Sequence, residues 1–337
     1  MVLVISTLVG ILCRVFLVVF IFSQKSLWEV GKLNRGNMNR LQANLLLTLA
    51  AMIWGSSFVV QQIGTGALGT ITFTGARFLL GGLVVLPFAM RQFLHVDGND
   101  RAFLSKDWLG IVLTGCILFT AAALQQHGIL RTTVINSGFL TALYVPLVPV
   151  IGLLFLKRKV HFSIWPASIF CFLGTFILSG AKDVELAIGD LWVISSTLFW
   201  ACHVILVGIM ASKTRAPLVV ACGQFLVCGV VGLVLGLIFE SPTFSQILGA
   251  GWGICYIGFF SVGMAFTFQV VGQRYTPAAD AAIILSSETV FAAMGGMVFL
   301  GERLSLFQLS GAAMILVAIL LVELLPLTSL GRPQTLE

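Results

Sequence analysis

Two ionisable residues lie within otherwise apolar sequence and are the strongest candidates for chemistry. Glu288 is about ten residues into the apolar run 278–300, which is near mid-depth in a membrane at 1.5 Å per residue. An isolated ionised carboxylate is costly in hydrocarbon, so this group must be protonated, paired or in contact with water. We expect Glu288 to bind either a coupling proton or a cationic group of a solute. The structural alternative is a protonated glutamate that is hydrogen-bonded to a neighbouring helix.

Arg77 is the second candidate, in the sequence TFTGARFLLGG at residues 72–82. It lies about two helical turns from the end of its apolar run. Its side chain could extend to the outer membrane surface, pair with Glu288, or bind a carboxylate, for which the planar guanidinium is well shaped. Arg77 and Glu288 together would suit a zwitterion such as an amino acid.

Uncharged polar and aromatic side chains complete the candidate set. Tryptophan inside a span predicts either helix packing or a cavity wall, and Gln and Ser side chains there commonly join helices. The only histidine well inside a span could titrate near neutral pH or be a hydrogen-bonded core residue. The residues expected to bind a solute or a coupling proton are Glu288, Arg77, Trp54, Ser57, Gln125, Tyr144, Trp200, His203 and Ser287. The sequence predicts no catalytic residue, no cofactor and no metal site.

Long apolar helices must position these residues. The chain has 337 residues, of which 58% are hydrophobic and only 9% are charged, whereas soluble proteins carry about 25% charged residues. An all-α integral membrane protein is predicted, because about 20 apolar residues cross a bilayer as a helix. The ten predicted transmembrane helices are at 41–62, 71–90, 108–126, 133–156, 162–180, 188–210, 216–239, 247–268, 278–300 and 304–325, and a further apolar run is at 2–22.

The distribution of the charges that make up the net charge of +6 indicates membrane topology and not nucleic-acid binding. If the N-terminal side of the 41–62 span is cytoplasmic, Arg131, Lys182 and Arg303 lie outside. Two arginines fall in apolar runs, and the other fourteen of the 19 basic residues lie inside. Basic residues gather on the cytoplasmic side of membrane proteins. We therefore expect a multi-pass protein of the cell inner (cytoplasmic) membrane, with both termini of the ten-span core in the cytoplasm.

The chain also repeats itself, since residues of the same type recur at a nearly constant spacing. A shift of 144 residues aligns Trp108 with Trp252 and Gln125 with Gln269, and a shift of 146 aligns Trp54 with Trp200. Each copy holds five spans, an odd number, so the second copy would enter the membrane from the opposite side. The predicted domains are a hydrophobic appendage at 1–37 with room for an extra span, two inverted five-helix repeats at 38–182 and 183–326, and a cytoplasmic tail at 327–337.

Five stretches carry a resemblance to a known family. They are WGSSFVV (54–60), GARFLLGGLV (75–84), TALYVPLVPVIGLLFLKRK (141–159), SSETVFAAMGGMVFLGERLS (286–305) and GAAMILVAILLVE (311–323). Over roughly 41–325 the chain resembles the EamA-type members of the drug/metabolite transporter (DMT) superfamily. The first repeat departs from the pattern where LKRK (156–159) replaces LGER. The resemblance implies a bacterial inner-membrane carrier, usually an exporter of small metabolites, with a cavity lined by the first four spans of each half.

Other classes of protein lack their motifs in this sequence. There is no G-x-x-x-x-G-K-[ST] for ATP-driven transport, no H-E-x-x-H and no G-x-S-x-G. We therefore predict a secondary active exporter of small metabolites or amino acids that works by alternating access with proton coupling. A passive facilitator or channel and a membrane-embedded enzyme are the alternatives. The expected partners are a small-molecule substrate and the lipid bilayer, with no nucleic acid, and a homodimer is left open.

Overall fold

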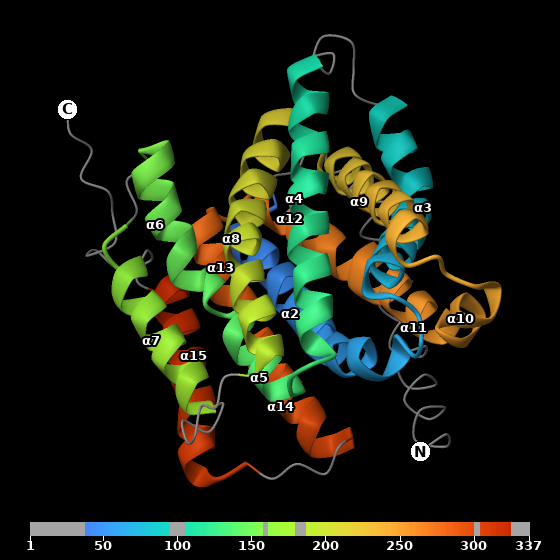
Figure 1. Ribbon diagram of the computed structural model, residues 1–337. Helices are drawn as coiled ribbons and strands as arrows, with labels where there is room; N and C mark the ends of the chain where they lie inside the picture. Colours follow the sequence, from blue (N-terminus) through green and yellow to red (C-terminus); the bar gives the residue numbers. More distant parts are fainter. Residues whose placement is uncertain (1–37, 95–104, 158–160, 179–186, 300–303, 325–337) are drawn as a thin grey trace. The chain divides into compact units, whose positions relative to one another are not determined.

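A computed structural model describes residues 38–94, 105–157, 161–178, 187–299 and 304–324. The appendage predicted at 1–37, the tail predicted at 327–337 and the LGER sequence at 300–303 lie outside these residues. All regular structure in the described residues is helical, and the helices belong to one compact unit, Arg40–Glu337 (Figure 1).

The helices follow the predicted spans. They are α2 (Arg40–Gly64), α3 (Thr70–Leu94), α4 (Ser105–Ile129), α5 (Val134–Thr141), α6 (Tyr144–Leu156), α7 (Ile164–Leu178), α8 (Ile188–Thr214), α9 (Pro217–Phe239), α10 (Phe244–Gly249), α11 (Gly251–Tyr256), η2 (Ile257–Phe266), α12 (Thr267–Gln273), α13 (Ala278–Leu285), α14 (Glu288–Phe299) and α15 (Leu306–Leu324). In the described chain, eight helical segments are long and apolar enough to cross a membrane, and α7 and α15 contribute shorter apolar helices. The predicted all-helical, multi-pass membrane protein is confirmed, and the count of ten spans stays a prediction.

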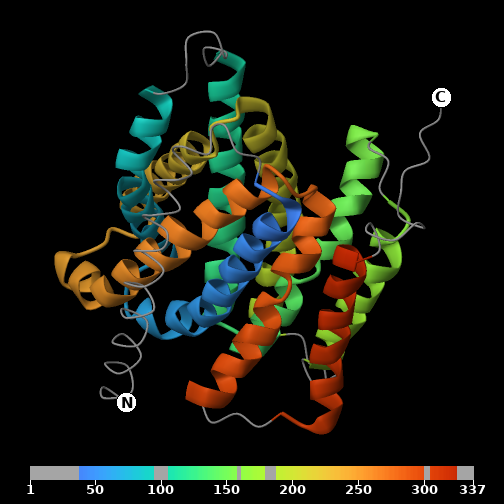
Figure 2. The same ribbon diagram turned by 180° about the vertical axis from the view of Figure 1, so that it is seen from behind.

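Helices from the two halves of the chain pack against one another in pairs. α3 packs on α9, α4 on α8 and α7 on α15, while α2 packs on η2, α12 and α14. Figures 1 and 2 show α3 beside α9 at one flank and α7 beside α15 at the other. Glycine allows two of these contacts, because a Cβ on Gly232 would lie 2.6 Å from Gly75 Cα, and a Cβ on Gly174 would lie 2.7 Å from the Gly311 carbonyl oxygen. A larger residue at these positions would force the helices apart.

Two predicted spans are broken in the middle, at equivalent positions of the repeat. α5 ends at Thr141 and α6 begins at Tyr144, whereas α13 ends at Leu285 and α14 begins at Glu288. The spacing between equivalent ends is the 144 residues of the sequence repeat. The two halves therefore share an interrupted helix as well as a hydropathy pattern.

Proline causes the first break. Pro146 has no N–H for the carbonyl of Ala142, and its ring clashes with that carbonyl. The amide of Val145 bonds the Ala142 oxygen instead, at 3.0 Å, which tightens the turn. The break lies four residues before Pro146, and Pro149 lies inside α6 without ending it.

Serine is associated with the second break, where no proline stands at the equivalent position. The hydroxyls of Ser286 and Ser287 donate to Ile283 O at 2.5 Å and to Ile284 O at 2.7 Å. Side-chain bonds of this kind to the preceding turn bend helices. Different local chemistry thus accompanies the same interruption in each half.

A π-helix, η2, occupies most of the second half of the span that was predicted at 247–268. Such segments are rare and are frequently found at functional sites. η2 packs against α2 and α3, so a segment of the second half lies against the first two helices of the first half.

Candidate functional site

A pocket lies between the two halves of the chain. Its walls come from α2 to α6 in the first half and from α8, η2, α12, α13 and α14 in the second. The cavity has a volume of about 50 Å³, and a cavity needs roughly 10–15 Å³ to hold one water molecule. The pocket therefore has room for a few waters or for part of a small solute.

Repeat-equivalent residues line this pocket from both halves. Trp54 and Trp200 face it, as do Gln125 and Gln269, and so do Tyr144 and Glu288. The three pairs come from the first, third and fourth predicted spans of each repeat. Equivalent positions of the two halves thus line the pocket. At one of these positions the residues differ in chemistry, with Tyr144 in the first half and Glu288 in the second.

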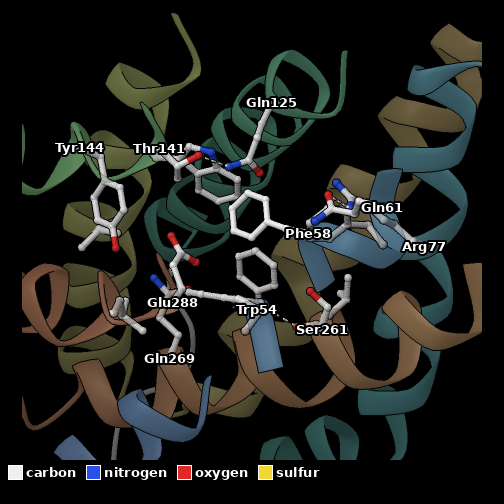
Figure 3. Close-up of a pocket in the computed structure, with 16 residues that line it drawn as sticks. Trp54, Phe58, Gln61, Arg77, Gln125, Thr141, Tyr144, Ser261, Gln269 and Glu288 are labelled. Atoms are coloured by element: carbon white, nitrogen blue, oxygen red, sulfur yellow. Dashed lines mark hydrogen bonds between the residues drawn. The ribbon is translucent and has the colours of Figure 1, made fainter. Parts of the chain in front are cut away.

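Glu288 is the first residue of α14, directly after the serine break. The residue is 5% exposed, and its carboxyl group has no hydrogen-bond or ion-pair partner in the part of the chain that the structure describes. Figure 3 shows Glu288 and Gln269 toward one end of the pocket and Arg77 with Gln61 toward the other. The structural alternative requires a hydrogen bond between Glu288 and a neighbouring helix. No such bond is present among the described residues.

Arg77 is buried in α3 with 4% of its surface exposed, so its side chain does not extend to the outer surface. It lines the pocket and donates a short hydrogen bond from Nη1 to Gln61 Oε1. Its guanidinium carbon lies 5.7 Å from the ring centroid of Phe73 and 5.4 Å from that of Phe78. Among the described residues no carboxylate pairs with Arg77, so Glu288 is not its partner. A positive charge therefore faces the pocket with no counter-anion in the part of the chain that the structure describes.

Aromatic rings form the wall between these two ends. The centroid of Phe266, in η2, lies 4.5 Å from Trp54, 5.9 Å from Trp200 and 5.5 Å from Phe78. Phe266 thus lies against both repeat-equivalent tryptophans. Apolar walls with a few convergent polar groups are typical of small-molecule sites.

Six of the nine candidate residues line the pocket, and three do not. Ser57 donates to Ile53 O at 2.8 Å within α2, and the hydroxyl of Ser287 bonds within the serine break. His203 Nε2 lies 2.8 Å from Gln224 Oε1 in a fully buried position. These contacts are those of helix-stabilising or core residues.

Several residues that line the pocket were not among those predicted from the sequence to bind a solute. Thr141 accepts a hydrogen bond from Gln125 at 2.9 Å, and Ser261 and Phe266 enter the pocket through η2. Gln269 could have been found from the repeat, since it is the mate of Gln125. No comparable signal marked the π-helical residues. In the described residues no three His, Cys, Asp or Glu side chains gather as metal ligands.

Comparison with known proteins agrees with this arrangement. A membrane transporter is the class that the helices and the pocket between them fit. The model of the EamA-like transporter family matches the chain twice, at residues 41–180 and 187–324. The chain belongs to this family, as its resemblance had suggested.

Relatives and a solved structure extend over the same region. The chain is 30% identical over 287 residues to a protein of Archaeoglobus fulgidus named an uncharacterized transporter, covering 85% of this chain and 87% of that protein. It is 24% identical over 296 residues to the uncharacterized transporter YwfM of Bacillus subtilis, covering 84% and 94%. One crystal structure matches with a TM-score of 0.67 at 18% identity, over 85% of this chain and 98% of that chain. That likeness concerns the fold alone.

Proposed function

We propose that the protein is a secondary active transporter that exports small metabolites or amino acids across the cytoplasmic membrane by alternating access. Its frame would be ten helices in two inverted five-helix repeats, at 38–182 and 183–326, with both ends of the core in the cytoplasm. The observation that carries the proposal is a pocket lined by equivalent residues of both halves, with a buried carboxyl group in it that has no partner among the described residues. Such sites between inverted repeats open to either side when one half rocks against the other.

Reciprocal hydrogen bonds between the halves support the inverted relation. Thr132 Oγ1 donates to Asp190 Oδ1 at 2.5 Å, and Thr276 Oγ1 donates to Asn44 Oδ1 at 2.8 Å. Thr276 is the repeat equivalent of Thr132, and Asp190 follows Asn44 by the 146 residues that separate the two tryptophans. Exchanging the two halves therefore turns one bond into the other, as a two-fold axis requires.

The caps of α3 and α9 are reciprocal in the same way. Gln92 Oε1, near the end of α3, accepts from Leu218 N at 2.9 Å at the start of α9. Glu240 Oε2, at the end of α9, accepts from Thr72 N at 2.8 Å at the start of α3. Two antiparallel helices that cap each other fit the opposite orientations proposed for their repeats.

Ion pairs join the halves on the side that the positive-inside rule assigns to the cytoplasm. Arg40 pairs with Asp280, and Lys213 Nζ lies 2.6 Å from Asp107 Oδ1. The carboxylates are largely buried, so separating either pair without water would be costly. We propose that both pairs break when the pocket opens to the cytoplasm.

The pocket chemistry favours a zwitterion with proton coupling. Arg77 lacks a carboxylate partner among the described residues and would bind a solute carboxylate, whereas Glu288 would bind an ammonium group or a proton. Solute and proton would then compete for one carboxylate, which is the simplest form of antiport.

Purified protein in liposomes tests the function. Radiolabelled amino acids, amines and carboxylates should show counterflow, in which unlabelled solute on one side drives labelled solute of the same kind from the other. A carrier gives this exchange, whereas a channel gives no acceleration and an enzyme returns altered solute. Absence of counterflow across the panel, in protein shown to be folded, would refute the proposal.

A further inference from the structure

The two pocket tryptophans differ in hydrogen bonding although they are repeat equivalents. Trp54 Nε1 donates to the carbonyl of Ser261 at 3.4 Å. Trp200 Nε1 is buried and has no partner among the described residues. The first indole therefore ties α2 to η2, while the second leaves a donor free beside the pocket.

The two pocket glutamines differ in the same sense. Gln125 Nε2 donates to Thr141 Oγ1 at 2.9 Å, and that hydroxyl donates onward to Ser137 O at 2.7 Å. Gln269 is 1% exposed, and its amide oxygen has no partner within the described part of the chain. The first glutamine is part of a hydrogen-bonded chain between α4 and α5, and the second is not.

The third pair repeats the pattern. Tyr144 donates from its hydroxyl to Ala282 O at 3.4 Å, whereas Glu288 has no partner in the described chain. At all three positions the first-half side chain bonds the protein, whereas the second-half side chain has no hydrogen-bond partner within the described residues.

We propose that Gln269 and Glu288 form the subsite that recognises the ammonium group of the solute, and that their first-half equivalents, Gln125 and Tyr144, hold the pocket helices together. This inference rests on the proposed transport function and assigns the specificity for an amine to one repeat. A buried polar atom without a partner is costly, and a bound ligand removes that cost. Gln269 Oε1 and the Glu288 carboxylate are both acceptors, so the group they bind must donate at least two hydrogen bonds. A primary ammonium donates three and neutralises the carboxylate. The ligand class is a small primary amine, with or without a carboxylate.

Matched variants at one repeat position separate recognition from structure. Gln269→Leu and Gln125→Leu make the same change in the two halves. Binding of L-leucine and of 3-methylbutylamine, which is leucine without its carboxylate, would be measured by calorimetry on purified protein in detergent, together with Tm. Gln269→Leu should weaken binding of both amines about ten- to a hundredfold without lowering Tm. Gln125→Leu should lower Tm, because it breaks a buried chain, and should weaken binding less than Gln269→Leu does.

The proposal is overturned if the wild-type protein binds neither amine, if both glutamine variants weaken binding equally, or if Gln269→Leu binds the amines as wild type does. Binding in detergent needs no gradient, so intact amine binding without counterflow would refute the transport function and support this subsite.

Discussion

Replacing Glu288 with glutamine should abolish coupling to a proton gradient and weaken amine binding, while solute exchange persists at concentrations high enough to fill the pocket. Among the described residues that line the pocket, Glu288 is the one carboxyl group, so we expect one exchangeable proton per transport cycle. One pH unit then supplies about 1.4 kcal/mol, which corresponds to a tenfold ratio of solute across the membrane. Glutamine keeps the size and hydrogen-bonding capacity of the side chain but cannot exchange a proton. The expected ratio of solute across the membrane is therefore about one for Glu288→Gln, because the variant has no carboxyl group at this position to exchange a proton.

Proteoliposomes with an imposed gradient of one pH unit provide the assay. Valinomycin and equal potassium on both sides clamp the membrane potential near zero, so that only the proton gradient can do work. With proton antiport, wild-type protein should concentrate the best solute of the counterflow panel on the acidic side. Counterflow by the variant, and a Tm like that of wild type, would show that it is folded and able to exchange solute. A tenfold accumulation that persists in Glu288→Gln would remove this carboxyl group from the coupling mechanism.

Three further predictions concern charge, packing and capping. Arg77→Gln should weaken transport of carboxylates and zwitterions about tenfold or more and spare simple amines in competition assays; an unchanged profile would make Arg77 structural. Gly232→Val should press against α3 and cost about 1–3 kcal/mol, seen as a lower Tm, whereas Gly152→Ala should not, because no atom lies within 4 Å of its Cβ position. Glu240→Ala removes three hydrogen bonds to Ile71 and Thr72 and should cost about 0.5–2 kcal/mol of stability; an unaltered Tm would show that water replaces the cap.

The helices were predictable because a bilayer leaves a chain few choices. Backbone groups in hydrocarbon must bond internally, so a long apolar run inside the membrane becomes a helix. The described helices accordingly coincide with the predicted runs. The exceptions lie where helices are interrupted. Pro146 displaces the break to Ala142 because the effect of a missing N–H appears at the carbonyl four residues earlier.

The interior of the pocket was harder to predict, because the direction of a side chain depends on its neighbouring helices. Trp200 lines the pocket, whereas His203, less than one turn along α8, bonds Gln224 in a buried contact with α9. Both are polar aromatic residues in an apolar run, and the sequence gives no means to separate them. The repeat gives partial help, because positions that line the pocket in one half tend to line it in the other. It would have added Gln269 to the candidates.

Duplication imposes different demands on the frame and on the site. If the two halves exchange conformations, as proposed, equivalent contacts between them must be able to replace one another, and the reciprocal bonds of Thr132 and Thr276 are such contacts. A zwitterionic solute, however, has two unlike ends and occupies the pocket in one orientation. A site with identical halves would bind it equally well in two orientations and could hold neither end firmly. Differences at equivalent positions, such as glutamate for tyrosine, would remove that ambiguity without disturbing the helices that move in the proposed mechanism.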